Sequence, residues 1–292
     1  MSTKRPIDEP TGTETTGHEW DGIRELDNPL PRWWLYIFYA CIIFAVGYTI
    51  AYPSIPLIER AWPGALKWSS RQELVADMTA IEQSRAEMDA EIANRSFEEI
   101  AADAGLMDYA QRSGASAFKI VCVQCHGSGA QGSQQLGYPN LNDDSWLWGG
   151  TMDAIYKTIS HGVRNGEDPE ARNSAMPAYG ALGILDQQQI SDVADYVRSL
   201  SGLEHDEAAA ERGAQTFATQ CVACHGADGG GNHLLGAPRL SDAIWLYGSD
   251  HADIMAQVTS PRMGVMPPWA QRFDEATRKK LAIYVHALGG GE

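Results

Sequence analysis

The sequence predicts an all-α chain in which one membrane-spanning helix and a helical linker precede two similar domains. Three observations support this prediction: an uncharged segment of 20 residues near the amino terminus, a charge-rich stretch without proline, and a long internal repeat. We expect a leader over residues 1–32, a transmembrane helix over 33–52, a largely helical linker over 53–112, and two domains over 113–202 and 203–292.

The uncharged segment runs from Trp33 to Tyr52, which is the length that a helix needs to cross a bilayer. Tryptophan and tyrosine residues lie at both of its ends, as is typical of side chains at the membrane–water interface. A cleaved signal peptide is disfavoured because an acidic leader precedes the segment and no Ala-x-Ala site follows it. We interpret Cys41, in the middle of the segment, as a small apolar packing residue.

The linker and the net charge indicate structure and function less specifically than the membrane segment does. Between residues 69 and 112 the apolar side chains recur with a loose helical spacing, which predicts one or two helices between the membrane and the domains. The formal net charge is −16 at pH 7, without a basic patch of the kind that nucleic-acid binding needs. Such acidity favours attraction of a basic protein partner, although it can also serve solubility alone.

The internal repeat covers most of the second half of the chain. A shift of 99 residues aligns residues 114–155 with residues 213–254 without a gap. Further on, Met176–Pro177 matches Met266–Pro267 at a shift of 90, so the first copy holds a nine-residue insertion within 165–173. A repeat of this length exceeds a solenoid unit and predicts two tandem domains near the lower end of domain size.

Each copy contains the pentapeptide Cys-x-x-Cys-His, which is the attachment signature of c-type haem. In such a site two thiols bond to the porphyrin and the adjacent imidazole binds the iron. A zinc site or a redox dithiol also uses Cys-x-x-Cys, but Cys41 is the single other cysteine, so no second thiol pair remains. We therefore predict two covalent haems, held by Cys122, Cys125, Cys221 and Cys224, with His126 and His225 as axial ligands.

Met176 and Met266 are the candidates for the remaining axial position of each iron. Each is followed by proline, which disfavours helix at the preceding residue and keeps the segment extended. A thioether ligand raises the reduction potential of haem. We expect Met176 to complete the site of His126 and Met266 that of His225, although an isolated methionine is usually a flexible core residue.

Several other side chains could compete for these roles. The possible iron ligands are Met152, Met255, Met263, His161, His233 and His251. The first two lie in predicted helices, the repeat selects Met266 over its neighbour, and none of the histidines is matched by a histidine in the other copy. Trp146 and Trp245 could donate hydrogen bonds to haem propionates or belong to the core, and Arg164 and Arg262 are weaker propionate candidates.

A wider resemblance starts at the junction Asn28-Pro-Leu-Pro-Arg-Trp-Trp34 and continues to Arg262-Met-Gly-Val-Met-Pro-Pro-Trp269. The chain resembles the di-haem subunit of cbb3-type cytochrome c oxidases, the FixP/CcoP type. This resemblance implies two tandem class I cytochrome c domains and the same four axial ligands. It also implies electron input from a soluble or membrane-anchored cytochrome c, with a mono-haem subunit and a catalytic haem–copper subunit as partners. The complete oxidase reduces oxygen to water and pumps protons.

The location follows from the haem motifs, because basic residues on the two sides of the anchor do not decide its orientation. Covalent haem is attached outside an energy-transducing membrane. We therefore expect periplasmic haem domains and a cytoplasmic leader at a bacterial inner membrane. Alternatives are a stand-alone di-haem carrier, the cytochrome subunit of a periplasmic dehydrogenase, and a di-haem peroxidase. The peroxidase needs an open iron position, which two Met-Pro ligands disfavour.

Overall fold

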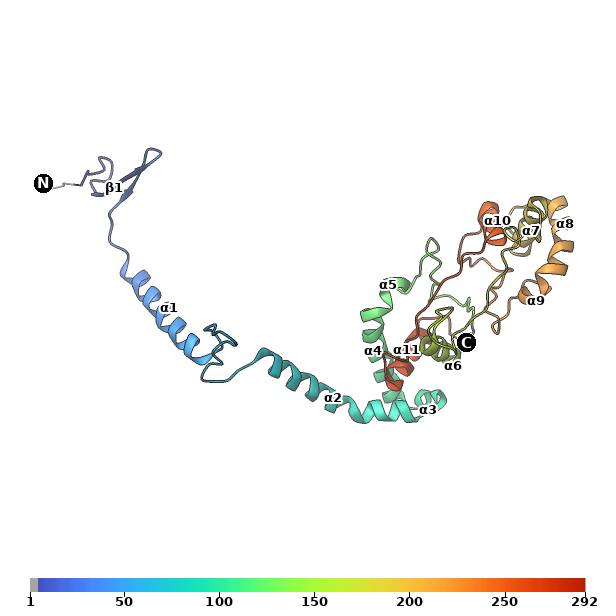
Figure 1. Ribbon diagram of the computed structural model, residues 1–292, viewed down its shortest axis with the longest axis horizontal. Helices are drawn as coiled ribbons and strands as arrows, with labels where there is room; N and C mark the ends of the chain where they lie inside the picture. Colours follow the sequence, from blue (N-terminus) through green and yellow to red (C-terminus); the bar gives the residue numbers. More distant parts are fainter. Residues whose placement is uncertain (1–4, 292) are drawn as a thin grey trace. The chain divides into compact units, whose positions relative to one another are not determined.

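The structure is a computed structural model that describes residues 5–291. They form two compact units that divide between Ser84 and Arg85. Figure 1 shows the elements, which are β1 Thr15–Trp20, β2 Ile23–Leu26, α1 Arg32–Ala51, α2 Ser70–Asn94, α3 Phe97–Ala102, α4 Ala104–Val121, α5 Val123–His126, α6 Met152–His161, α7 Gln187–Leu200, α8 Glu207–Gln220, α9 Val222–His225, α10 His251–Thr259 and α11 Glu275–His286. The predominance of helix confirms the predicted fold class.

The first unit begins with a β-hairpin that we did not predict from the sequence. Strands β1 and β2 pair antiparallel, with Trp20 opposite Ile23. The two residues between them, Asp21 and Gly22, have φ angles of 50° and 83°. Asp-Gly is one of the sequences that accept positive φ at both positions of a two-residue hairpin turn. The dipeptide was therefore a usable signal for this hairpin.

Helix α1 begins and ends one residue before the predicted membrane-spanning segment. None of its residues is buried within the structure. Among the residues that the structure describes, it is the one helix that is long and apolar enough to cross a membrane. The chain then folds back on the end of this helix, because Ala65 and Leu66 donate backbone hydrogen bonds to Ile50 and Ala51 at 2.8 and 3.0 Å.

The second unit contains two hydrophobic clusters. The first is built mainly on α4, α6 and α11 and includes Phe118, Ile155 and Ile283. The second is built on α7, α8 and α10 and includes Val193, Phe217 and Ile254. Each cluster therefore combines helices from both copies of the repeat.

The two copies exchange their last helices. Helix α11, which ends the second copy, packs against α4 and α6 of the first copy, and α7, which ends the first copy, packs against α8 and α10 of the second. Figure 1 shows α11 beside α4 and α7 beside α8. The two copies follow one another along the chain, as the expected domains 113–202 and 203–292 do, but each last helix packs against the other copy. The expected start at 113 also falls inside α4.

Each exchanged helix crosses its neighbour at a glycine. A β-carbon on Gly114 of α4 would overlap the backbone carbonyl oxygen of Lys280 in α11. A β-carbon on Gly213 of α8 would likewise overlap the carbonyl oxygen of Asp192 in α7. Gly114 and Gly213 are equivalent at the shift of 99, and Asp192 and Lys280 occupy matching places in the closing helices. The same helix crossing is therefore built twice, each time between the two copies.

Aromatic pairs lie next to both crossings. The ring centroids of Phe118 and Tyr284 are 5.3 Å apart, and those of Phe217 and Tyr196 are 5.0 Å apart. Both pairs are tilted, which is a favourable geometry for aromatic rings at this separation. Phe118 and Phe217 are each 1 % exposed, so these pairs form the centres of the two clusters.

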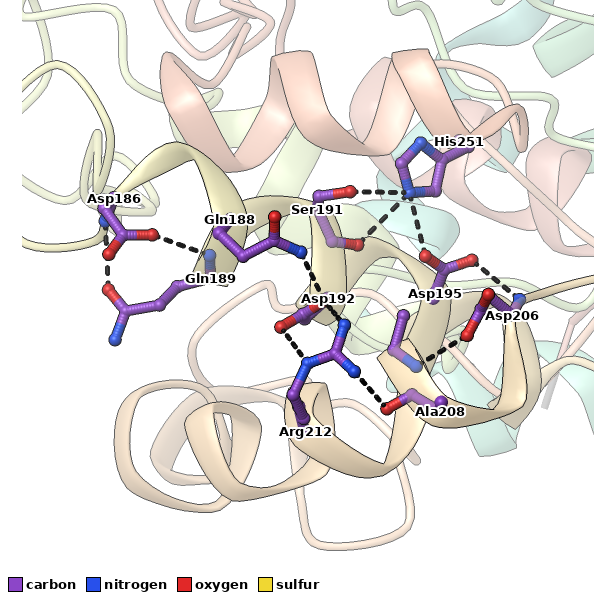
Figure 2. A network of polar contacts seen from close by, with 11 residues as sticks. Asp186, Gln188, Gln189, Ser191, Asp192, Asp195, Asp206, Ala208, Arg212 and His251 are labelled. Carbon is purple, nitrogen blue, oxygen red and sulfur yellow. Dashed lines mark hydrogen bonds and ion pairs between the residues drawn. The ribbon is translucent and has the colours of Figure 1, made fainter.

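A polar network fastens α7 to the second copy, as Figure 2 shows. Arg212 of α8 donates two hydrogen bonds to the carboxylate of Asp192, at 2.7 and 2.9 Å. One oxygen of Asp195 accepts from the backbone N–H of Asp206 at 3.1 Å, and the other lies 3.2 Å from Nε2 of His251. The hydrogen bonds from Arg212 lower the pKa of the buried Asp192, so this carboxylate stays ionised where it packs.

We predict that Gly114→Ala lowers the free energy of unfolding by about 1–3 kcal/mol or more, the usual cost of overpacking. The added methyl group overlaps the backbone of α11. Gly105→Ala, in the first turn of the same helix, is the control, because the nearest atom to its new β-carbon lies 3.5 Å away and alanine favours helix. Urea unfolding followed by circular dichroism measures both. Equal stability of the two variants would contradict a tight crossing.

We also predict that Asp192 stabilises the fold less in acid. Its pKa in the folded protein lies below the ordinary value of 3.8. The stabilisation is therefore present above about pH 3.8 and is lost as the pH falls through the folded pKa. The difference in unfolding free energy between the natural chain and Asp192→Asn should therefore stay constant at higher pH and shrink as the pH falls below about 3.8. A difference that does not change with pH would show that the Asp192–Arg212 pair is not coupled to folding.

Candidate haem centres

Both Cys-x-x-Cys-His motifs begin where a long helix ends. Helices α4 and α8 end just before Cys122 and Cys221, and the short helices α5 and α9 follow. The N–H groups of Cys125 and His126 both donate to the carbonyl oxygen of Cys122, at 3.2 and 2.9 Å, and the second motif has the same pattern. This single helical turn places the two thiols, three residues apart, on one face.

Backbone carbonyl groups orient the two imidazoles. Nδ1 of His126 lies 3.2 Å from the carbonyl oxygen of Pro139, and Nδ1 of His225 lies 3.1 Å from that of Pro238. A carbonyl oxygen can only accept, so Nδ1 carries the hydrogen and Nε2 keeps its lone pair for a metal. Burial lowers the pKa of both rings. The neutral, metal-binding form is therefore favoured at neutral pH.

The four motif cysteines lie in two different settings. Cys122 and Cys221 face the core, and burial raises the pKa of each thiol to about 11. Cys125 and Cys224 are exposed. In each motif one thiol thus lies at the apolar cluster and the other at its rim, which suits attachment at two edges of one porphyrin.

The structure places each methionine with the motif of the other copy. Met266 packs against the cluster that contains Phe118 and Cys122, and Met176 packs against the cluster that contains Phe217 and Cys221. The expected pairs, Met176 with His126 and Met266 with His225, are therefore not brought together. Met266 lies in the segment that precedes α11, and Met176 lies in the segment that precedes α7. Each methionine is therefore in the opposite copy together with the helix that follows it.

Hydrogen bonds hold both methionine segments in these places. Val163, just after α6, exchanges two backbone hydrogen bonds with Met266, each 2.9 Å long. On the other side, the hydroxyl of Tyr179 donates to the carbonyl oxygen of Gln220 at 2.8 Å. Because Gln220 directly precedes the second motif, this bond fixes the Met176 segment beside it.

The rival histidines contact other groups. Nδ1 of His161 lies 3.0 Å from Asp168, and Nε2 of His251 lies 3.2 Å from Asp195. His233 is exposed.

The rival methionines also have other positions. Met152 and Met255 lie on α6 and α10 and pack from these helices onto the two clusters. Met263 is 41 % exposed. Met176 and Met266 remain the methionines that extended segments carry to the clusters.

The residues considered for haem propionates behave differently from one another. The indole N–H of Trp146 donates to the carbonyl oxygen of Gly290, while Trp245 packs against the second cluster. The guanidinium of Arg164 donates to two backbone carbonyl oxygens at 3.0 Å, and Arg262 to two others at 3.3 Å. Trp146 therefore has a partner within the fold and Trp245 contributes to core packing, whereas neither arginine has a carboxylate partner among the described residues.

A third arginine was missed in the sequence. The guanidinium of Arg172 lies 5.4 Å from the ring centroid of Trp148, and that of Arg262 lies 4.8 Å from that of Tyr247. Arg172 also has no carboxylate partner among the described residues and donates to groups of α6. The signal was present, because Arg-x-x-x-Met-Pro occurs in both copies at the shift of 90.

These residues fit two c-type haems. Each site offers two thiols on one face, an imidazole with a free Nε2, a thioether and an apolar cluster. Three arginines that lack a carboxylate partner within residues 5–291 lie on the segments after α6 and α10, and their positive charge suits the negative propionates: Arg164, Arg172 and Arg262.

Comparison with known proteins gives the same picture along the chain. Residues 12–59 match the family described as the N-terminal domain of cytochrome oxidase-cbb3, FixP, residues 111–201 match cytochrome c, and residues 208–285 match cytochrome c oxidase, cbb3-type, subunit III. The chain is 50 % identical to the cbb3-type cytochrome c oxidase subunit CcoP of Cereibacter sphaeroides over all of both chains. It is 51 % identical to the subunit FixP of Sinorhizobium medicae over 98 % of each.

With an anchoring helix and two Cys-x-x-Cys-His sites, this protein is a membrane-anchored di-haem cytochrome c. It carries two covalently bound c-type haems. The chain belongs to the CcoP/FixP family of cbb3-type cytochrome c oxidase subunits. This confirms the resemblance that starts at the junction before the membrane helix, and it favours an electron-transfer subunit over a peroxidase.

Proposed function

We propose that this chain passes electrons from a cytochrome c donor to the mono-haem and catalytic subunits of a cbb3-type oxidase, which reduces oxygen to water and pumps protons. Similarity to subunits of that name over the whole length carries the proposal. The bound haems supply the exchange of electrons. The chain's own residues hold the iron, exclude water and adjust the potential.

The proposed location is a bacterial inner membrane, with the leader in the cytoplasm and the haem sites in the periplasm. Covalent attachment of c-type haem outside the membrane supports this orientation, since both motifs follow the membrane helix. The donor is a soluble or membrane-anchored cytochrome c. The net charge of −16 favours a basic donor, because complementary charge accelerates association.

For the axial ligands we propose crossed pairs, His126 with Met266 and His225 with Met176. The packing of each methionine against the cluster of the opposite motif supports these pairs. Histidine with methionine leaves no open position on iron and raises the reduction potential. Both sites would then carry electrons and bind no oxygen or peroxide.

Single-haem variants test the crossed pairs. In a chain whose second motif is inactivated by Cys221→Ala with Cys224→Ala, we predict that Met266→His lowers the midpoint potential of the remaining haem, because imidazole replaces the thioether. In the same chain, Met176→His should leave that potential unchanged. Redox titration followed by visible absorption measures both.

The reciprocal chain is the control. With Cys122→Ala and Cys125→Ala, Met176→His should lower the potential of the remaining haem and Met266→His should not. The haem content must be one per chain in both backgrounds, against two in the natural protein. A shift that follows the methionine of the same copy would restore the consecutive pairing.

Oxygen uptake by spheroplasts tests the proposed function and its orientation together. With this chain as the only subunit of its kind, a reduced small basic cytochrome c, which cannot cross the membrane, should support oxygen uptake from outside. A chain with alanine at all four motif cysteines should abolish it, since both haems are lost. Uptake that appears only after the membrane is broken would overturn the orientation. No uptake even then, with both haems present, would overturn the electron-input function.

A further inference from the structure

The short segment Gly162–Arg164 lies between the two methionine segments. On one side Val163 pairs antiparallel with Met266 through two backbone hydrogen bonds of 2.9 Å. On the other side the chain that leads to Met176 runs parallel to it, because Arg164 donates to the carbonyl oxygen of Arg172 at 2.8 Å and Arg172 donates to that of Gly162 at 3.1 Å. The backbone of this segment is thus hydrogen-bonded both to the Met266 segment and to the chain that leads to Met176.

The side chain of Arg164 also forms hydrogen bonds with both methionine segments. Its Nε donates to the carbonyl oxygen of Gly264 at 3.0 Å, and its Nη1 donates to that of Ser174 at 3.0 Å. Ser174 and Gly264 are equivalent at the shift of 90, and each stands two residues before its methionine. One planar guanidinium therefore bonds matching carbonyl groups of both methionine segments.

The position of Arg164 is costly for the fold, which separates it from an ordinary surface arginine. Its backbone has φ +48°, a conformation that side chains other than glycine rarely adopt. The guanidinium is half-buried and has no carboxylate partner among the described residues, and burial lowers its pKa. In the second copy Arg262, which stands 90 residues after Arg172, donates instead to the carbonyl oxygens of Gln135 and Tyr247. Within the described residues, Arg164 is therefore the arginine whose side chain bonds both methionine segments.

We infer that Arg164 is a positioning residue shared by both haem sites, which fixes the backbone of both methionine segments and places one positive charge beside them. The inference rests on the proposed function, in which Met176 and Met266 are axial ligands. A positive charge favours the reduced, more negative state of a nearby haem. Loss of Arg164 should therefore lower both midpoint potentials, whereas loss of a residue in one pocket should alter one.

The test is Arg164→Gln in the full-length chain with both haems attached, with Arg164→Lys as a second variant that keeps the charge but loses the planar fork. Arg198→Gln is the matched control. Arg198 also donates to two backbone carbonyl oxygens, those of Glu204 and Ser249, which belong to neither methionine segment. The readouts are the two midpoint potentials and the far-red charge-transfer band of methionine-bound ferric haem.

We expect Arg164→Gln to lower both potentials and to weaken the methionine band of both haems. Arg164→Lys should weaken the band with a smaller shift in potential, and Arg198→Gln should leave the band unchanged. The inference is overturned if Arg164→Gln changes one haem only or neither, or if Arg198→Gln produces the same paired change. If Arg164→Gln fails to accumulate, Arg164→Lys is the deciding variant. A change in both haems supports the inference, and a change in one haem only or in neither overturns it.

The natural chain separates this inference from the proposed function. If its ferric form lacks the methionine band, the axial ligands are wrong and the proposed function fails at its haem sites. If the band is present and corresponds to two methionine-bound haems, but the Arg164 variants leave it and both potentials unchanged, the inference alone fails.

Discussion

The haem unit depends on the close contact of two helix pairs at glycine. Only without a β-carbon at Gly114 and Gly213 can α4 approach α11, and α8 approach α7, at the backbone. In both pairs the helices come from different copies, so the contact that forms each core also exchanges the ends of the copies. The Met-Pro segments directly precede the exchanged helices. The position of each candidate iron ligand therefore depends on a backbone contact that lies outside the haem motifs and the Met-Pro segments.

The exchange makes the two sites interdependent. The motif that starts at Cys122 shares a hydrophobic cluster with Met266, which lies more than a hundred residues further along the chain. Neither copy can bury its motif with its own last helix, because that helix packs in the other cluster. Residues 85–291 therefore pack as one compact unit, although the sequence repeat suggests two. In such a unit, the two sites are joined by shared helices rather than by a flexible linker.

Local patterns were sufficient to predict the motifs, the membrane helix and both candidate methionines, since each depends on a few neighbouring residues. The exchange could not be predicted for a physical reason. Phe118 and Phe217 are equivalent in the repeat, and so are Tyr284 and Tyr196. Exchanged and consecutive arrangements thus bury the same kinds of side-chain pairs. Only the path of the connecting segments distinguishes them, and no residue pattern encodes that path as directly as a haem motif encodes a ligand.

The inserted loop is not needed for the exchange. The second copy lacks the loop, and its last helix still packs against the first copy. Its first residue instead supports one methionine segment. Nδ2 of Asn165 donates to the carbonyl oxygens of His161 at 2.8 Å and Met266 at 3.1 Å, and its Oδ1 accepts from the N–H of Glu167 and Asp168. In the part of the chain that the structure describes, Met176 has no contact that matches that of Asn165, since the second copy lacks the loop. A nearly symmetric duplication thus holds its two methionines in different surroundings, and this allows two haems with similar ligands to differ in potential.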